Sequence, residues 1–322
     1  MTKPIRIVCG SLALLLAFLS IVTLAPATRT AAQGDPIRVV TTVGMIGDAV
    51  RNIGGDRVEV INLMGPGVDP HLYKPTAGDV SDLESADIIF YGGLELEGRM
   101  VDTFEMIARS GKPTVAVTME IPVEYLRQPP EFKGRYDPHI WFDVTLWMWA
   151  VNTISKNLQA YSPEDAAMFQ ANTDAYQAQL QQLDRYVREQ IARIPEQNRI
   201  LVTAHDAFGY FGQQYGIEVH GLQGTSTATE ASASDVQTLT ELIVSRQVPA
   251  IFVESSVPPA TIEAVREACR AQGWEVVIGE PLFSDAMGEE GTPEGTYIGM
   301  VTHNVDAIVS ALSGGSAATP AA

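Results

Sequence analysis

Cysteine is almost absent from this chain of 322 residues, which contains only Cys9 and Cys269. Because Cys9 lies in a segment that we expect to be removed, a disulfide framework and a cysteine-rich zinc knuckle are both excluded. Basic residues are also scarce: 21 Lys and Arg stand against 39 Asp and Glu, for a net charge of −18. Since phosphate binding needs basic patches, this balance argues against nucleic acid as a partner.

Long apolar runs are confined to the start of the chain. Lys3 and Arg6 precede an apolar stretch over residues 7–25, and small residues follow up to Ala32. This order is typical of a secretory signal peptide, so we expect 1–32 to be cleaved and the protein to be exported as an extracytoplasmic protein, periplasmic or at the cell surface. A retained membrane anchor is the alternative that the sequence leaves open.

The full chain is 46% hydrophobic and 19% charged, which is enough apolar material for a sizeable core. Strand and helix signals alternate from residue 37, and such alternation indicates parallel sheets with helices on both faces. We therefore expect an N-terminal α/β lobe over 33–161. The predicted strands in it are 37–42, 58–64, 87–91 and 114–118, and the predicted helices are 43–53, 76–86 and 96–109.

One long helix interrupts the alternation. It begins with a cap at Ser162 followed by Pro163, and apolar residues then recur at helical spacing until Ile194, just before Pro195. At 1.5 Å per residue this predicts a rod of ~48 Å. Alternation resumes in a second lobe over 196–312, and 313–322 reads as a disordered tail. The predicted fold is thus two α/β lobes with mostly parallel sheets, joined by one long backbone helix over 162–195.

Two of the five histidines share one local setting, Asp69-Pro-His71 and Asp137-Pro-His139. Proline accounts for only 19 of 322 residues, so chance is a poor explanation for two such tripeptides. Proline fixes its own φ and holds the preceding residue extended. Each histidine is therefore expected on a stiff loop.

His71 and His205 follow predicted strands of different lobes. Open α/β sheets place their ligands at the carboxyl ends of strands, so these two histidines would meet in the cleft between the lobes. Together with His139 and one carboxylate they would form a normal shell for a divalent cation. His220 and His303 lie in no unusual loop, and we interpret both as structural.

The fourth ligand should be an acid on a loop of the second lobe. Asp285 is the first candidate, because it lies in a loop that follows the predicted strand 275–279 and ends in glycine. Position alone also leaves open four other acids: Asp206, Glu230, Glu254 and Glu280.

Six motifs occur in order along the chain: Asp69-Pro-His-Leu-Tyr, Asp137-Pro-His-Ile-Trp-Phe-Asp, His205-Asp-Ala-Phe-Gly-Tyr-Phe, Gly221-Leu-Gln-Gly-Thr-Ser-Thr, Phe252-Val-Glu-Ser-Ser and Leu282-Phe-Ser-Asp-Ala-Met-Gly. Through them the chain resembles the zinc/manganese solute-binding proteins of bacterial ABC importers over about residues 37–312. The resemblance implies metal ligands at His71, His139, His205 and Asp285. It further implies a receptor without enzymatic activity, Zn²⁺ or Mn²⁺ as the transported ligand and an ABC importer permease as the partner. We expect it to act as a monomer.

Two features depart from the usual pattern of this family. Many members are lipoproteins, whereas Cys9 precedes the apolar run here, where a lipid-attachment cysteine is not expected. Many zinc-dedicated members carry a histidine-rich loop after the first ligand, whereas 74–86 contains no histidine, so the choice between zinc and manganese stays open. The alternatives from other classes are a secreted zinc metallohydrolase, which would need an open metal position, and a surface adhesion module, which would need no metal.

Overall fold

The computed structural model describes residues 1–2 and 34–313. The predicted signal peptide and C-terminal tail therefore lie outside the described residues, apart from Met1, Thr2 and Ser313. All elements given below belong to the compact unit that begins at Pro36. Within the described part of the chain, Cys269 is buried and unpaired, and none of the helices combines the length and apolar character that a bilayer crossing requires.

The N-terminal lobe is built on a parallel sheet with the strand order β2-β1-β3-β4. The central strand β1 is buried on both faces, with Val39 and Val40 fully inaccessible, as expected for a parallel sheet covered by helices. The strands of this lobe are β1 (Ile37–Thr41), β2 (Val58–Asn62), β3 (Ile88–Tyr91) and β4 (Thr114–Ala116), and the connecting helices are α1 (Gly44–Gly54), α2 (Ala77–Ser85) and α3 (Val101–Arg109). Helix α3 begins five residues later than predicted, because residues 96–100 form turns in which the amides of Leu96 and Met100 donate to the carbonyls of Gly93 and Glu97.

In the C-terminal lobe strands and helices again alternate along the chain, and two of its strands are only two residues long. Two parallel pairs form, and the amide of Phe252 donates to the carbonyl of Val202 between them. The elements are β5 (Ile200–His205), α6 (Gly209–Tyr215), β6 (Glu218–Gln223), α7 (Ala233–Arg246), β7 (Ala250–Ile251), α8 (Ala260–Ala271) and β8 (Val277–Ile278). The carboxyl end of β5 is thereby presented toward the N-terminal lobe.

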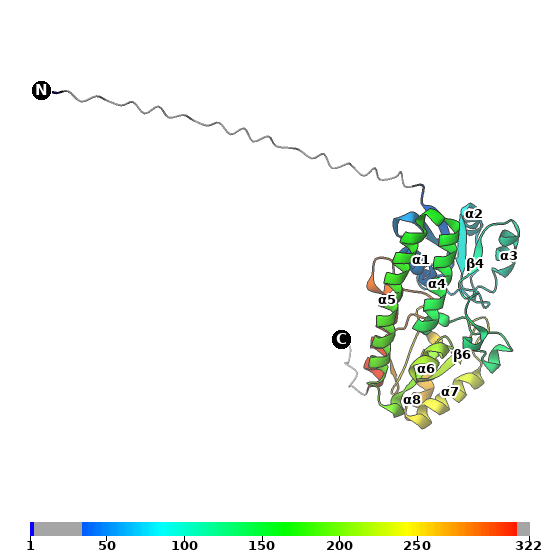
Figure 1. Cartoon of the computed structure of the whole chain (residues 1–322). Coiled ribbons are helices and arrows are strands. Elements are labelled where there is room, and N and C mark those ends of the chain that lie inside the picture. The colour runs from blue at the N-terminus through cyan, green and yellow to red at the C-terminus, as the bar shows by residue number, and fades with distance from the viewer. Residues whose placement is uncertain (3–33, 314–322) are drawn as a thin grey trace. The chain divides into compact units, whose positions relative to one another are not determined.

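The predicted long helix is present as α5 (Ala166–Ile191), and Figure 1 shows it running along both lobes. It packs against α1 of the N-terminal lobe and α6 of the C-terminal lobe. Its 26 residues correspond to about 39 Å, less than predicted, because Pro163–Asp165 form a separate 3-10 turn. The predicted apolar stripe is buried: Phe169, Tyr176, Leu180, Leu183, Val187 and Ile191.

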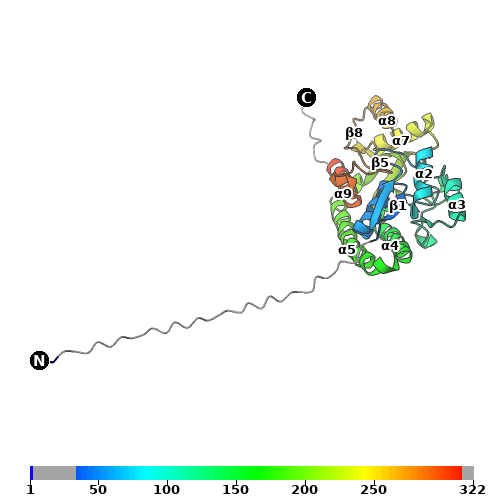
Figure 2. The same ribbon diagram turned by 90° about the horizontal axis from the view of Figure 1, so that it is seen from above.

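Two further long helices, α4 (Val144–Tyr161) and α9 (Tyr297–Leu312), lie against α5 (Figure 2). Helix α4 is missing from the predicted elements and is a correction to them. The sequence did contain its signal, because Asp143 caps its first turn and buried apolar residues recur at helical spacing. Those residues are Leu146, Trp147, Ala150, Val151, Ile154 and Leu158.

A single apolar cluster spans both lobes and the long helices. It includes Ile46 of α1, Leu180 of α5, Phe208 beside α6 and Tyr297 of α9. A second, smaller cluster lies inside the C-terminal lobe between its strands and helices α7 and α8. Because the larger core is continuous across the lobes, the loops that connect strands to helices between the lobes are held on a common support.

Candidate metal centre

The N-terminal lobe contributes His71 and His139 through the two Asp-Pro-His loops. The loop of His71 follows β2, and its amide donates to Asp69 Oδ1 at 2.8 Å. His139 begins a 3-10 turn over Ile140–Phe142, and its amide donates to Asp137 Oδ1 at 3.0 Å. In both loops the aspartate thus fixes the backbone of the histidine two residues later, as in an Asx turn.

The C-terminal lobe contributes His205 and Asp285. His205 is the last residue of β5, and Asp285 lies in the loop after β8. Gly221 of β6 pairs with Thr203, close to the end of β5. A Cβ atom at Gly221 would lie 2.4 Å from the amide nitrogen of Asp206, so a glycine is required for β6 to approach the His205 turn.

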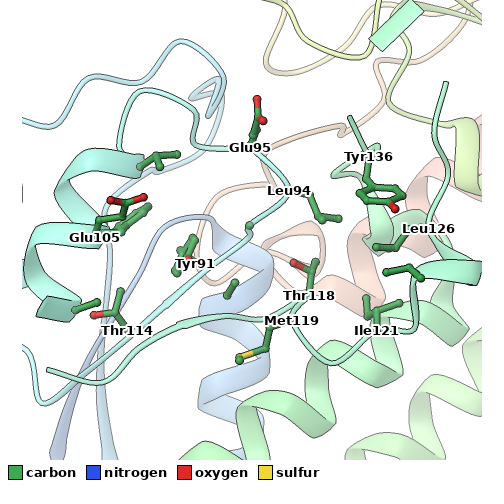
Figure 3. Close-up of a pocket in the computed structure, with 16 residues that line it drawn as sticks. Tyr91, Leu94, Glu95, Glu105, Thr114, Thr118, Met119, Ile121, Leu126 and Tyr136 are labelled. Atoms are coloured by element: carbon green, nitrogen blue, oxygen red, sulfur yellow. The ribbon is translucent and has the colours of Figure 1, made fainter. Parts of the chain in front are cut away.

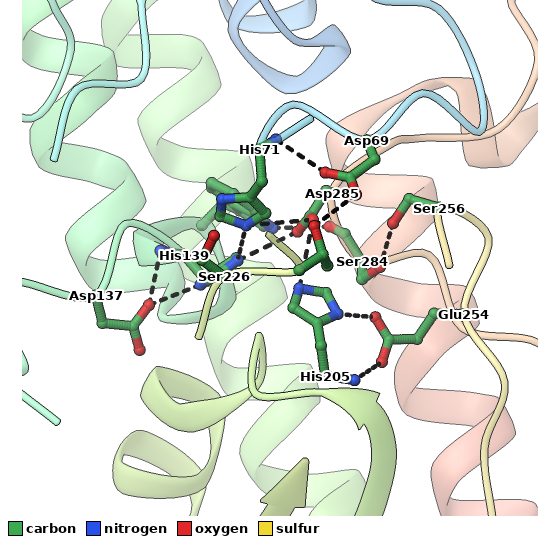
Figure 4. Close-up of polar contacts among 12 residues, drawn as sticks. Asp69, His71, Asp137, His139, His205, Ser226, Glu254, Ser256, Ser284 and Asp285 are labelled. Atoms are coloured by element: carbon green, nitrogen blue, oxygen red, sulfur yellow. Dashed lines mark hydrogen bonds and ion pairs between the residues drawn. The ribbon is translucent and has the colours of Figure 1, made fainter. Parts of the chain in front are cut away.

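These four side chains converge on one point between the lobes (Figure 4). One ligand atom from each of His71, His139, His205 and Asp285 lies within 4.8 Å of the other three. The Nε2 atoms of His71 and His139 are 3.3 Å apart. Asp285 Oδ1 is 3.3 Å from His139 Nε2, and Asp285 Oδ2 is 3.3 Å from His205 Nε2.

The group is nearly sealed from solvent. His71 is 5% exposed, and His139, His205 and Asp285 are fully buried. Neither carboxylate oxygen of Asp285 has a hydrogen-bond partner among the described residues. A buried carboxylate is costly unless a cation neutralises it, and here either protonated imidazoles at 3.3 Å or a divalent metal bound by the four side chains can do so.

A carboxylate holds the far side of the His139 ring. Asp137 Oδ1 lies 2.7 Å from His139 Nδ1, and Arg127 Nη1 donates to Asp137 Oδ2 at 2.5 Å. Burial alone would lower the pKa of His139, but Asp137 and Asp285 outweigh it and raise the pKa to about 9. Because Asp137 contacts Nδ1, Nε2 of His139 points toward the other three side chains of the group. Outer carboxylates orient metal-binding histidines in this way.

His205 is held in the same manner from the C-terminal lobe. Glu254 Oε2 is 2.6 Å from His205 Nδ1, and Glu254 Oε1 accepts the His205 amide at 2.8 Å. Burial disfavours the charged ring, but Glu254 and Asp285 raise the pKa of His205 well above its usual value. The pKa of Asp285 is well below its usual value, because the charged rings of His205 and His139 outweigh its burial.

His71 differs from the other two imidazoles. No hydrogen bond to its Nδ1 occurs within the described part of the chain, and burial dominates and lowers its pKa to about 3. His71 is therefore neutral at physiological pH and offers a lone pair, whereas His139 carries a proton that an incoming metal ion must displace.

The other acids and histidines considered from the sequence lie elsewhere. Asp206, Glu230 and His220 line a separate pocket of about 360 Å³, and His220 pairs with Glu218 at 2.8 Å. His303 Nε2 is 3.0 Å from the carbonyl oxygen of Pro281, and its ring packs on Phe283. Glu280 lies outside the group of four candidate ligands. Glu254 contacts His205 through its backbone amide and its outer ring nitrogen, and it does not belong to the group of four.

A larger hollow on the N-terminal lobe does not coincide with the histidines. Its volume is about 540 Å³, and it lies over β3, β4 and α3 (Figure 3). The side chains around it are mainly apolar, such as Phe104, Met119 and Ile121. This hollow lacks the histidines and buried carboxylate that make the group between the lobes suitable for a metal ion.

The sequence did not predict the residues that support the four candidate ligands. Arg127, which binds Asp137, carries no local signal, because its role depends on a contact between segments. The sequence left Glu254 open as a ligand, whereas the structure places its carboxylate on the outer side of the His205 ring, with Oε2 2.6 Å from Nδ1. Asp137 was visible as part of a repeated tripeptide, and the repetition was the signal that could have identified it as a support.

Two α/β lobes on a shared long helix, with a buried group of three histidines and one aspartate between them, are typical of the class of two-lobed solute receptors. The family described as "Zinc-uptake complex component A periplasmic" matches residues 39–311. Since this match covers most of the chain, the protein belongs to that family. The resemblance inferred from the six motifs is thereby confirmed.

Individual relatives agree with this assignment. The chain is 53% identical over 283 residues to the zinc-binding protein TroA of Treponema pallidum (strain Nichols), covering 88% of this chain and 91% of that protein. It is 48% identical over 276 residues to the manganese-binding lipoprotein MntA of Bacillus subtilis (strain 168), covering 86% and 90%. Its structure is similar to that of the periplasmic zinc-binding protein TroA from Treponema pallidum, with a TM-score of 0.84, 52% identity and coverage of 87% of this chain and 100% of that one.

Proposed function

We propose that this protein is an extracytoplasmic receptor that captures a divalent transition metal, zinc or manganese, and delivers it to the permease of an ABC importer. The metal ligands in this proposal are His71, His139, His205 and Asp285. The observation that carries it is the convergence of these four buried side chains, one ligand atom from each lying within 4.8 Å of the others. Relatives described as zinc-binding and manganese-binding proteins support the same function.

A receptor fits the geometry better than a metallohydrolase. A catalytic zinc keeps an open position for water, whereas four protein ligands complete a tetrahedral shell. The ligands are also 0–5% exposed, which leaves little room for a substrate beside the metal. Other members of the family act as transport receptors, and we propose the same role here.

Both candidate metals suit the donor set. Three imidazoles and one carboxylate provide nitrogen and oxygen atoms, and affinity at a given site rises from manganese toward zinc. We expect zinc to displace manganese from the purified protein, whichever of the two is transported. We also expect Asp285→Asn to weaken manganese binding more than zinc binding, because manganese depends more on oxygen donors and on charge. A competition titration of both ions with both proteins tests this, and manganese outcompeting zinc in the wild type would contradict it.

Thermal unfolding with and without zinc tests the proposed function itself. A metal that binds only the folded site stabilises it by mass action, ~4 kcal/mol at a thousandfold excess over the dissociation constant. We expect a clear rise in Tm with one zinc ion bound per chain, measured by elemental analysis after gel filtration. Equal melting temperatures and no retained metal at neutral pH would favour the adhesion alternative.

A further inference from the structure

The segment between β6 and α7, residues 224–231, contacts the loop of the first ligand. Thr227 of this segment donates its hydroxyl to Asp69 Oδ2 at 2.6 Å, and Thr227 is largely buried. The other oxygen of Asp69 accepts the amide of His71, as the dashed line in Figure 4 marks. Asp69 therefore joins the C-terminal lobe to the backbone of a proposed metal ligand.

Release of a buried ion requires at least one ligand to move. Two of the four candidates are held directly by an outer carboxylate, and the backbone beside a third is fixed. Asp137 holds the ring of His139 and Glu254 holds that of His205. Next to Asp285, Ser284 is fixed through its hydroxyl, 2.8 Å from the Ser256 hydroxyl, and through its carbonyl, which accepts the Trp141 indole N–H at 3.0 Å. These restraints leave the fourth ligand as the one that moves most easily.

His71 is that fourth ligand. Its ring is the most exposed of the four, and no hydrogen bond holds its outer nitrogen within the described residues. Leu72, the next residue, is 41% exposed, so this loop borders solvent. The contact between Asp69 and the His71 amide is a direct restraint on the position of the loop.

We propose that the hydrogen bond from Thr227 to Asp69 is a latch between the lobes that positions His71 and limits the rate at which bound metal leaves. This inference rests on the proposed function of the site. While the latch is closed, Asp69 is fixed on both oxygens and the His71 backbone cannot swing outward. When the hydrogen bond from Thr227 to Asp69 breaks, Asp69 and His71 move together, and the metal loses one ligand.

Because the acceptor is a carboxylate, the latch is a hydrogen bond to a charged group, which is stronger than a neutral one. Thr227→Val keeps the shape of the side chain and removes the hydroxyl. We expect metal to leave this variant about 10- to 100-fold faster, the range that corresponds to losing such a bond. The association rate should change much less, because the four ligands themselves are intact.

The experiment measures release of zinc from the full-length mature protein into an excess of a chelator by stopped flow. Thr227→Ser restores a hydroxyl and should return the rate toward that of the wild type. Thr229→Val is the matched control, since Thr229 lies in the same segment with an exposed side chain. The double variant Asp69→Ala/Thr227→Val should release zinc no faster than Asp69→Ala alone, because the first change already removes the latch.

Melting of the metal-free proteins checks that each variant folds. Wild-type release kinetics in Thr227→Val would overturn the latch, as would equal acceleration by Thr229→Val, which would indicate a nonspecific effect of the segment. Failure of the wild type to retain zinc would instead refute the proposed function. The two failures are therefore distinguishable.

Discussion

The two Asp-Pro-His loops have the same tripeptide but different surroundings. In both, the aspartate accepts the amide of the histidine, at 2.8 Å in the first loop and 3.0 Å in the second. In the second loop, Asp137 also contacts the His139 ring and is itself bound by Arg127. In the first loop, the remaining oxygen of Asp69 turns away from the ring and binds Thr227 of the other lobe.

The comparison shows that the position of the backbone and the protonation of the ring have different causes. The tripeptide fixes the backbone, whereas the neighbours set the protonation of the ring. Burial lowers the pKa of both rings. For His139 the carboxylates of Asp137 and Asp285 more than compensate and raise the pKa to about 9, whereas for His71 burial dominates and the pKa is about 3. In the metal-free site His139 is thus a charged partner of Asp285, and His71 is a neutral imidazole whose lone pair is available.

The largest expected effect comes from removing either histidine. His71→Ala and His139→Ala should each weaken zinc binding by more than the ~10–100-fold typical of outer supporting residues, and His205→Ala should do the same. The two loops should differ in the metal-free protein. His139→Ala removes the buried cation that Asp137 and Asp285 share and leaves Asp137 with Arg127 and Asp285 with His205, so it should lower the Tm of the metal-free protein, whereas His71→Ala should change it little.

Isothermal titration and thermal unfolding of both variants provide the measurement. Unchanged zinc affinity in any one histidine variant would remove that residue from the site. Equal loss of metal-free stability in His71→Ala and His139→Ala would contradict the assigned difference in charge.

The next effect concerns the support of the ring. Asp137→Asn should weaken zinc binding about 10–100-fold, because the His139 ring loses the carboxylate that orients it. It should also reduce the number of protons released on binding at pH 7.5, since His139 no longer holds its proton as tightly. Calorimetry in two buffers of different ionisation enthalpy counts these protons. An unchanged proton count would show that Asp137 does not set the pKa of His139.

A smaller effect is expected in the dependence of stability on pH. The pKa of His139 is raised on folding, so its contribution is fully present below about 6.5 and is lost as pH rises through about 9. The pKa of His71 is lowered, so its contribution is lost as pH falls from about 6.5 toward 3. The rise in Tm caused by zinc should therefore grow between pH 6.5 and 9. Melting curves across that range check it, and a constant rise would argue that His139 is neutral before metal binds.

The smallest effect is expected outside the site. His220→Ala should leave zinc affinity within about twofold, ~0.5 kcal/mol, because this histidine pairs with Glu218 at a partly exposed position away from the ligands. The same titration serves as the control for the three ligand variants. A loss comparable to theirs would mean that imidazoles act through the overall fold and not through direct ligation.

Much of the fold was predictable because its signals are local. The spacing of apolar residues indicated α5, and turn residues with β-branched runs indicated most strands. The same kind of signal was present for α4, which the predicted elements omit. The repeated tripeptide marked His71 and His139 without any knowledge of where the loops would go.

By itself, the sequence determined which local elements form and which residue types are available to a metal, because propensity, turn chemistry and periodicity act between near neighbours. Only the tertiary structure decided that Asp285 faces the three imidazoles while Glu254 lies behind His205. It also decided that Arg127 supports one Asp-Pro-His loop and Thr227 the other. These distances depend on how loops far apart in sequence are carried together by two sheets packed on a common core, and no local pattern specifies them.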